Sequence, residues 1–344
     1  MTQKKNIIYV SHAEKNPSGG GKIIYHHSEI VNNSKNYSSQ VVHIKKKKTS
    51  KWKNSLKKKF NFKISNETGW QLHEIEAVKN FKFDWFAHNI SIKNNLKFNP
   101  RSDFVILPEI FSHLADDLLI KKNIKYAIFV LNGYSIKFTN NESKLNKAYN
   151  NAQFILSFSN DITECIKLNF PKLKTKIIKI KVSVEPYTKN FKLKKRKLIT
   201  YMSRKHPYHS KIVVDLLKKN LPKGWEIKDL NNVSETQVYR YLKQSKIFLS
   251  FSNLEGLALP PVEAALLRNK VIGYTGEGAK DYWRKPIFTE IYSGDLRNFV
   301  NQVISEILNP IKKSIETEKQ LKWLKNEFSK KNEQFYVKKF LHKI

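Results

Sequence analysis

The sequence predicts an α/β protein built from two parallel-sheet domains. Strand-like and helix-like segments alternate along the chain, which favours parallel α/β architecture over a β-sandwich or a helical bundle. A chain of 344 residues is longer than a domain with a single hydrophobic core usually is, so we expect two domains. A polar segment broken by Pro186 and followed at once by a new strand marks the boundary between them.

The predicted strands are short apolar runs, and they fall into two groups. Those of the first half are expected near 6–11, 40–44, 82–87, 103–108, 125–131, 153–157 and 176–180. Those of the second half are expected near 198–202, 225–228, 246–250, 270–274 and 287–289, with helices near 209–219, 234–244, 260–268 and 294–307. The Lys- and Glu-rich segment 310–342 is predicted to be helical. We therefore expect Rossmann-like domains over 1–185 and 198–325, a linker over 186–197, and a C-terminal helix over 326–344 that crosses back to the first domain.

The formal charge of +35 suggests a polyanionic partner, such as nucleic acid, an anionic membrane or an acidic glycan. The composition weakens that inference, because only seven of the 64 basic residues are Arg and the other 57 are Lys. Phosphate and base recognition favours the planar Arg side chain. Abundant Lys, Asn and Ile together indicate a compositional bias as the main source of the charge, and no nucleic-acid-binding motif accompanies it.

The single cysteine, Cys165, excludes an internal disulfide, and no group of residues has metal-site spacing. The amino terminus lacks the apolar stretch of a secretory signal, and no run reaches the roughly 18 apolar residues of a membrane span. We expect a cytoplasmic protein that needs no metal. The lysine-rich segment 45–60 spaces Trp52, Leu56 and Phe60 as one helix face, which suits peripheral contact with an anionic membrane; a solvated lysine-rich insertion is the alternative.

Two carboxylates stand eight positions apart in Asn253-Leu-Glu255-Gly-Leu-Ala-Leu-Pro260-Pro261-Val-Glu263. The two prolines suit the first turn of a helix, where a missing N–H costs nothing. Glu255 is therefore expected before this helix and Glu263 about one turn inside it. A strand precedes the loop, and ligands of open α/β sheets bind at the carboxyl ends of strands.

Other candidate ligand-binding residues also follow predicted strands. Arg204 and Lys205 come after the first strand of the second half, and Lys211 lies in the next helix; such cations suit a diphosphate. Gly19, Gly20 and Gly21 form a loop before a helix expected to begin near Lys22, where backbone N–H groups could meet an anion. Gly276 stands in a glycine-rich loop after a later strand, and His12 follows the first strand.

The segment Glu255-Gly-Leu-Ala-Leu-Pro-Pro-Val-Glu263 resembles the Glu-x7-Glu motif of retaining GT-B glycosyltransferases, especially glycosyltransferase family 4. The adjacent Arg and Lys of Tyr201-Met-Ser-Arg-Lys-His-Pro207 and the amino-terminal glycines are similar to the diphosphate-binding turn and the glycine-rich turn of members of this family. The resemblance is dense in motifs over 198–283 and architectural over the first 185 residues. It implies two Rossmann-like domains facing across a cleft, with C-terminal helices.

The resemblance also implies an activity and a role for each matching residue. The activity would be transfer of a sugar, of hexosyltransferase type, from a nucleotide-diphosphate-sugar to a glycan, lipid-linked or protein acceptor with retention of configuration. Glu263 would bind the ribose and Glu255 the donor sugar, with backbone amides of Gly256 and Leu257 beside it. Arg204 and either Lys205 or Lys211 would neutralise the diphosphate, and the glycines at 19–21 would close over it from the other domain.

Three positions depart from the family pattern. Ala258 and Asn269 stand where glycine is frequent, and the strand to Leu131 ends in Asn132 rather than the histidine of many members. Asn132 and His12 are therefore weak candidates for the acceptor side. Three alternative functions stay open: a sugar-nucleotide epimerase, a non-catalytic sugar-nucleotide binder and a basic nucleic-acid-binding protein.

Overall fold

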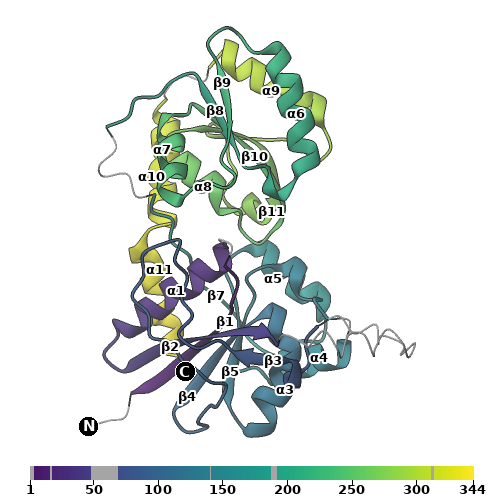
Figure 1. The fold of residues 1–344 in the computed structure, drawn as a ribbon, viewed down its shortest axis with the longest axis vertical. Helices are drawn as coiled ribbons and strands as arrows, with labels where there is room; N and C mark the ends of the chain where they lie inside the picture. The colour runs from purple at the N-terminus through teal and green to yellow at the C-terminus, as the bar shows by residue number, and fades with distance from the viewer. Residues whose placement is uncertain (1–3, 16–17, 48–68, 140, 187–191, 311–313) are drawn as a thin grey trace. The chain divides into compact units, whose positions relative to one another are not determined.

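The chain folds into two compact units, shown in Figure 1. The computed structural model describes residues 4–15, 18–47, 69–139, 141–186, 192–310 and 314–344. Unit 1 comprises Met1–Ser157, Thr163–Ile180 and Val337–Ile344, and unit 2 comprises Phe158–Ile162 and Lys181–Tyr336. The predicted second-domain strands and the Glu255–Glu263 segment all belong to unit 2.

Unit 1 is built on a sheet with the strand order β3-β2-β1-β4-β5-β6-β7. The strand β3 runs antiparallel to β2, and the other described pairs are parallel. Strand β4 is buried throughout, as expected for a parallel strand with both faces covered. The strands are β1 (Lys5–His12), β2 (Tyr37–Lys46), β3 (Ile75–Ala77), β4 (Asp103–Pro108), β5 (Lys125–Phe129), β6 (Phe154–Ser157) and β7 (Ile177–Lys179).

The helices of unit 1 follow the strands in alternation, as the sequence predicts. They are α1 (Gly19–Asn32), α3 (Ala115–Leu118), α4 (Glu142–Asn151) and α5 (Asn160–Asn169), whose first residues cluster with unit 2. Helix α1 begins at Gly19, three residues before the predicted start, because the side chain of Ser18 caps it by accepting a hydrogen bond from the Gly21 N–H at 3.2 Å. The three glycines are thus the first turn of a helix, and the prediction that they form a loop is wrong.

The predicted strand at 82–87 is wrong, since these residues adopt no strand. The aromatic side chains of this apolar run form a cluster instead. The Phe83 ring is buried and lies 4.8 Å from that of Tyr25 on α1, and the Phe83 N–H donates to the Tyr25 hydroxyl at 3.1 Å. Trp85 and Phe86 contact each other beside it, with ring centroids 4.4 Å apart. The aromatic residues of 82–87 are therefore buried by packing against α1 rather than by a neighbouring strand.

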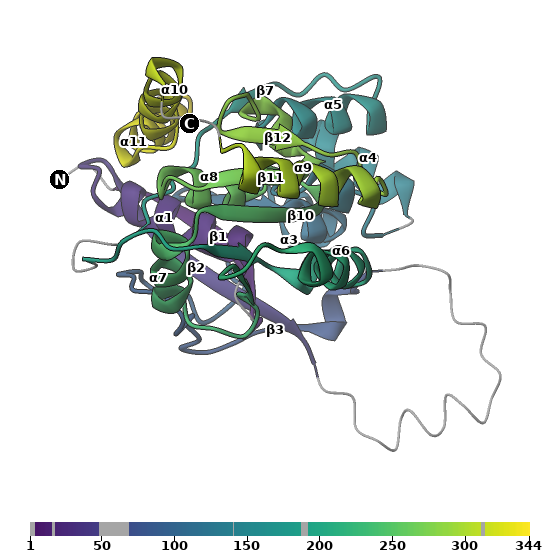
Figure 2. The same cartoon turned by 90° about the horizontal axis from the view of Figure 1, so that it is seen from above.

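Unit 2 is built on a sheet with the strand order β12-β11-β10-β8-β9, in which the described pairs are parallel. Figure 2 shows β10, β11 and β12 following one another across this sheet. The strands are β8 (Leu198–Tyr201), β9 (Glu226–Asp229), β10 (Ile247–Glu255), β11 (Lys270–Glu277) and β12 (Phe288–Glu290). Strand β10 extends five residues beyond its predicted end, so that Glu255 is its last residue.

The helices of unit 2 cover the two faces of its sheet. Val213 and Leu217 of one helix and Phe299 and Val303 of another pack on one face with Leu249 of β10. These two helices, α6 and α9, lie together on that side in Figure 1, and α7 and α8 lie on the other. The helices are α6 (Pro207–Asn220), α7 (Glu235–Gln244), α8 (Leu259–Leu266), α9 (Leu296–Leu308), α10 (Ile315–Glu327) and α11 (Lys330–Leu341).

The carboxyl-terminal segment forms two helices, α10 and α11. Helix α10 packs against α8 in unit 2. The last turns of α11 cluster with unit 1, where the ring of Phe340 lies 6.2 Å from that of Phe104 and the Tyr37 hydroxyl donates to the Leu341 carbonyl at 2.7 Å. The sequence-based domain limits at 185 and 198 stay a prediction, and part of the 186–197 linker lies outside the described residues.

Asn269 joins the ends of two helices in unit 2. Its buried amide donates to the Leu242 carbonyl of α7 at 2.9 Å and to the Ala264 carbonyl of α8 at 2.8 Å, and its side-chain oxygen accepts from the Ser245 hydroxyl. The preceding residue, Arg268, takes the left-handed conformation that follows many helices, with φ at 62°. At this position the sequence departs from the glycine that is frequent in glycosyltransferase family 4, and the Asn269 side chain makes hydrogen bonds that a glycine could not make.

The basic segment 45–60 is mostly outside the described residues. Its first residues, Lys45 and Lys46, end strand β2 and pair with Glu76 at 3.4 Å and Glu74 at 3.2 Å. These two lysines therefore belong to a strand, which contradicts their assignment to an amphipathic helix. Among the described residues, no helix is long and apolar enough to cross a membrane.

Candidate functional site

The two motif carboxylates lie where the carboxyl end of β10 meets helix α8. Glu255 ends the strand, residues 256–258 form the connection, and Glu263 lies on the first turns of the helix, as the prolines predict. Both residues are half-buried. This position is the edge of a parallel sheet at which ligands bind.

The connection between Glu255 and α8 is closely packed. A Cβ at Gly278 would lie 2.2 Å from the Gly256 carbonyl oxygen, so the backbones of two loops approach each other where only glycine fits. Leu257 is buried, and the hydroxyl of buried Tyr282 donates to the Ala258 carbonyl at 2.5 Å. Ala258 itself has φ at 57°, a left-handed conformation that costs an alanine free energy and that glycine adopts readily.

Gly276 lies near the end of the adjacent strand β11, beside this connection. Its φ is 63°, and a Cβ there would lie 2.9 Å from the Ser252 Cβ of β10. Both the conformation and the close approach require glycine. The predicted candidate at 276 is thus next to the β10 segment that leads to Glu255.

Lys205 and Glu255 form an ion pair, with Lys205 Nζ 2.8 Å from Glu255 Oε1. Lys205 ends a single 3-10 turn, Ser203–Lys205, that follows β8. Asp229 at the end of β9 fixes this turn, because Ser203 donates to its carboxylate through both its hydroxyl, at 2.6 Å, and its N–H, at 3.3 Å. The sequence-predicted cation and carboxylate thus meet at one edge of the sheet.

Arg204 and Lys211 are placed differently from Lys205. Arg204 lies in the same turn as Lys205, and both are exposed, but the ion pair with Glu255 is made by Lys205. Lys211 lies one turn inside α6 and pairs with Asp215 of its own helix, with Lys211 Nζ 2.6 Å from Asp215 Oδ2. Of the two lysines that the resemblance left open for the diphosphate, Lys205 is the one that the structure brings to Glu255.

Tyr239 of α7 holds Glu263. The tyrosine is buried, and its hydroxyl lies 3.2 Å from Glu263 Oε1 and 3.2 Å from Glu235 Oε1. Burial, followed by the negative charges of Glu263 and Glu235, raises the pKa of Tyr239 well above its ordinary value. The hydroxyl therefore keeps its proton and donates it to a carboxylate, which orients Glu263.

A pair of histidines lies at the same edge of the sheet; the sequence interpretation takes His206 as a loop histidine and does not pair it with His209. The rings of His206 and His209 stack with centroids 4.0 Å apart, and His209 Nδ1 lies 3.1 Å from the Tyr274 hydroxyl. Burial and the neighbouring His209 lower the pKa of His206. Their spacing of three residues at a predicted helix start could have indicated the pair.

The candidates of unit 1 lie at the carboxyl ends of its central strands. His12 is the last residue of β1, and its ring contacts those of Trp70, at 5.3 Å, and Phe111, at 6.1 Å. Asn132 follows β5 and caps a short turn by accepting from the Tyr134 N–H at 3.0 Å. Gly21 lies in the first turn of α1 in close contact with Phe83, since a Cβ there would lie 2.7 Å from the ring.

Glu109 is a buried carboxylate of unit 1 that the sequence interpretation missed. It follows β4, and it accepts hydrogen bonds from the N–H groups of Leu131, at 2.9 Å, and Asn132, at 3.1 Å. Burial raises its pKa to about 7, although these N–H groups act in the opposite direction. A glutamate directly after the buried run Phe-Val-Ile-Leu-Pro was the available signal.

No family model and no curated protein sequence matches the chain. Solved structures match it over nearly its whole length. HepE of Anabaena, in complex with UDP and glucose, has a TM-score of 0.68 at 8% identity, covering 99% of this chain and 100% of that one. Sucrose-phosphate synthase of Thermosynechococcus elongatus has a TM-score of 0.64 at 9% identity, with 99% of each chain covered.

TarM of S. aureus, as a point mutant in complex with fondaparinux, α-GlcNAc-glycerol and UDP, is also similar. It has a TM-score of 0.65 at 12% identity and covers 98% of this chain and 99% of that one. At these identities the likeness concerns the arrangement of the backbone. The chain has the GT-B fold of these glycosyltransferases over its whole length.

Proposed function

We propose that the chain is a retaining glycosyltransferase that moves a sugar, of hexosyl type, from a nucleotide-diphosphate-sugar to a glycan, lipid-linked or protein acceptor. One observation carries the proposal: the Lys205–Glu255 ion pair stands at the end of β10, beside the helix that presents Glu263. A cation for a diphosphate and two carboxylates for hydroxyl groups thus lie at one edge of the sheet.

In this proposal Glu263 accepts hydrogen bonds from the ribose hydroxyls, and Tyr239 holds its carboxylate for that purpose. Glu255 contacts the donor sugar, while the backbone N–H groups of Gly256 and Leu257 meet sugar or phosphate. Gly276 lets the donor approach the backbone of β11. HepE and TarM were each solved in complex with UDP, which supports a UDP-sugar as the donor to test first.

The diphosphate would bind at cations and helix N–H groups. Arg204 and Lys205 neutralise its charge in unit 2, with Lys211 as a more distant cation. In unit 1, Gly19, Gly20 and Gly21 are the first turn of α1; the Gly21 N–H donates to Ser18, so the N–H groups of Gly19 and Gly20 are those proposed to meet the diphosphate. That both units meet one donor molecule is part of the proposal. His12 and Asn132 are the residues proposed for the acceptor side.

The proposed reaction breaks the bond between the anomeric carbon and the diphosphate oxygen and forms a bond to the acceptor oxygen on the same face. The acceptor hydroxyl proton passes to the departing phosphate oxygen. Lys205 and Arg204 lower the barrier by stabilising the negative charge that develops on the leaving group. The ion pair with Glu255 supports this role, since it holds the Lys205 ammonium group beside the carboxylate proposed to contact the donor sugar.

Binding of UDP to the Glu263→Ala variant tests the assignment. We expect the dissociation constant to rise at least tenfold, as loss of a charged hydrogen-bonding group implies. Glu235→Ala is the matched control, because Glu235 shares the Tyr239 hydroxyl with Glu263 but lies on α7. Equal UDP binding by Glu263→Ala and wild type would refute the site. If the protein binds UDP but neither hydrolyses nor transfers any UDP-sugar, it is a non-catalytic sugar-nucleotide binder and the proposed activity is wrong.

A further inference from the structure

A cavity of unit 2, of about 630 Å³, lies at the end of the sheet opposite to Glu255. Its lining includes Lys195, which precedes β8, and Arg268, which precedes β11. Both residues come before strands, whereas Glu255 ends one. The cavity is therefore separate from the proposed donor site, and its volume is in the range of small-molecule sites.

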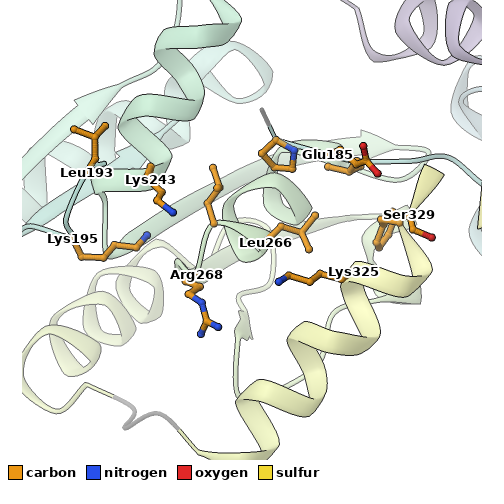
Figure 3. A pocket seen from close by; sticks show the side chains of 12 residues that line it. Glu185, Leu193, Lys195, Lys243, Leu266, Arg268, Lys325 and Ser329 are labelled. Carbon is orange, nitrogen blue, oxygen red and sulfur yellow. The ribbon is translucent and has the colours of Figure 1, made fainter. Parts of the chain in front are cut away.

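Four cationic side chains line this cavity, as Figure 3 shows: those of Lys195, Lys243, Arg268 and Lys325. Its one acidic lining residue is Glu185, whose carboxylate pairs with Lys330, 3.3 Å from the Lys330 Nζ. Apolar walls, including Leu266 and Phe328, complete the lining. The cavity thus joins a concentration of positive charge to an apolar surface.

Two of the four cations have structural partners. Lys195 Nζ donates to the Leu242 carbonyl at 3.1 Å and to the Ser245 carbonyl. The lysine thus caps the carboxyl end of α7. Arg268 binds Glu318 with two hydrogen bonds, at 2.5 and 3.0 Å. Neither arrangement engages Lys243 or Lys325, and among the described residues no carboxylate pairs with either of these two.

The positive charge of the cavity is only partly neutralised, because Arg268 pairs with Glu318 while Lys243 and Lys325 have no carboxylate partner among the described residues. Burial, together with the positive charges of Lys243 and Arg268, lowers the pKa of Lys195 to about 7. Like charges are thus held near one another around a concave surface, where an anion would relieve their repulsion. The general abundance of lysine accounts for exposed lysines, but it does not account for their convergence on one cavity.

We propose that this cavity binds a phosphate monoester, with its phosphate between Lys243 and Lys325 and its carbon portion against the apolar wall. A phosphate carries close to two negative charges and accepts several hydrogen bonds, so it matches two unpaired ammonium groups better than a single carboxylate does. The ligand would be either a soluble phosphorylated metabolite or the monoester headgroup of phosphatidic acid, which share this chemistry. The proposal does not depend on the glycosyltransferase activity.

Titration calorimetry with glycerol 3-phosphate at physiological salt tests the site on the full chain. We expect wild type to bind, and the Lys243→Gln/Lys325→Gln variant to bind about a hundredfold more weakly, at about tenfold for each charge removed. The control is Arg240→Gln/Lys322→Gln, which removes two exposed charges from the same helices outside the cavity and should bind as wild type does. A parallel titration of Arg204→Gln reports on the donor site and should also match wild type.

Flotation with vesicles distinguishes the two sources of phosphate. Vesicles of phosphatidic acid mixed with phosphatidylcholine, but not of phosphatidylcholine alone, should carry wild type and not the Lys243→Gln/Lys325→Gln variant if the ligand is a lipid headgroup. Glycerol 3-phosphate binding without flotation would identify a soluble ligand. The proposal is overturned by unchanged binding in Lys243→Gln/Lys325→Gln, by loss of binding in Arg204→Gln instead, or by no binding in either experiment.

Discussion

The buried carboxyl group of Glu109 should make the stability of unit 1 depend on pH. Its pKa is raised from 4.5 to about 7 in the folded chain, chiefly by burial. Below pH 4.5 the group is protonated in the folded and the unfolded state, so it contributes no difference. Between pH 4.5 and 7 the unfolded state loses this proton first, and the free energy of unfolding therefore falls as the pH rises. Above pH 7 the loss is complete.

The expected loss follows from the size of the shift. A shift of about 2.5 units corresponds to about 3 kcal/mol, since one pKa unit is about 1.4 kcal/mol. Glu109→Gln removes the ionisation while keeping one oxygen that can accept from Leu131 or Asn132. The stability of this variant relative to wild type should therefore rise by about 3 kcal/mol from pH 4.5 to pH 7.5.

Urea unfolding of wild type and Glu109→Gln at the two pH values, followed by circular dichroism, measures this difference. Glu142→Gln is the control, because the side chain of Glu142 is 70% exposed on α4 of the same unit. Its stability relative to wild type should stay within about 0.5 kcal/mol across the range. If Glu109→Gln and wild type differ by the same amount at both pH values, burial does not set the ionisation of Glu109 and the reasoning is refuted.

Three further predictions concern the proposed site and its surroundings. Ala258→Gly should raise the free energy of unfolding by up to about 1 kcal/mol, because glycine adopts the left-handed conformation without strain, and thermal denaturation of the two proteins checks this. Lys205→Met should lower kcat for sugar transfer about 10²-fold or more, while Lys211→Met should lower it less than about tenfold; equal losses would contradict the assignment of Lys205 to the leaving group. Gly21→Ala should destabilise unit 1 by about 1 to 3 kcal/mol through collision with Phe83, and urea unfolding at neutral pH would show no change if the ring can move aside.

The fold could be predicted from the sequence because its signals are local. Buried parallel strands are continuous apolar runs, and the prolines at 260 and 261 place a helix start directly after β10. The positions of Glu255 and Glu263 relative to this helix followed from that alone. The apolar run at 82–87 wrongly predicted a strand, because its aromatic residues are buried against α1 rather than against a neighbouring strand.

The remaining parts of the site depend on contacts between segments far apart in the sequence. Nothing near Lys205 in the sequence indicates that its ammonium group, rather than that of Lys211, pairs with a carboxylate 50 positions away. The role of Tyr239 likewise depends on the packing of α7 against α8. Glutamate is usually a surface residue. Only the fold shows that Glu109 is buried and accepts hydrogen bonds from two backbone N–H groups.

The side chain of Asn269 bonds to both α7 and α8. The geometry of the proposed nucleotide site therefore depends on a residue that is not expected to contact the nucleotide. The helix α8 has eight residues and spans about 12 Å; Glu263 is its fifth residue, and the Asn269 amide bonds to the carbonyl of the next residue, Ala264. Since Asn269 bonds to both helices, it helps to hold the Tyr239 hydroxyl of α7 against the Glu263 carboxylate of α8. Loss of the Asn269 hydrogen bonds would let Tyr239 and Glu263 move apart without changing either residue. We expect such a change to lower the selectivity for ribose over deoxyribose.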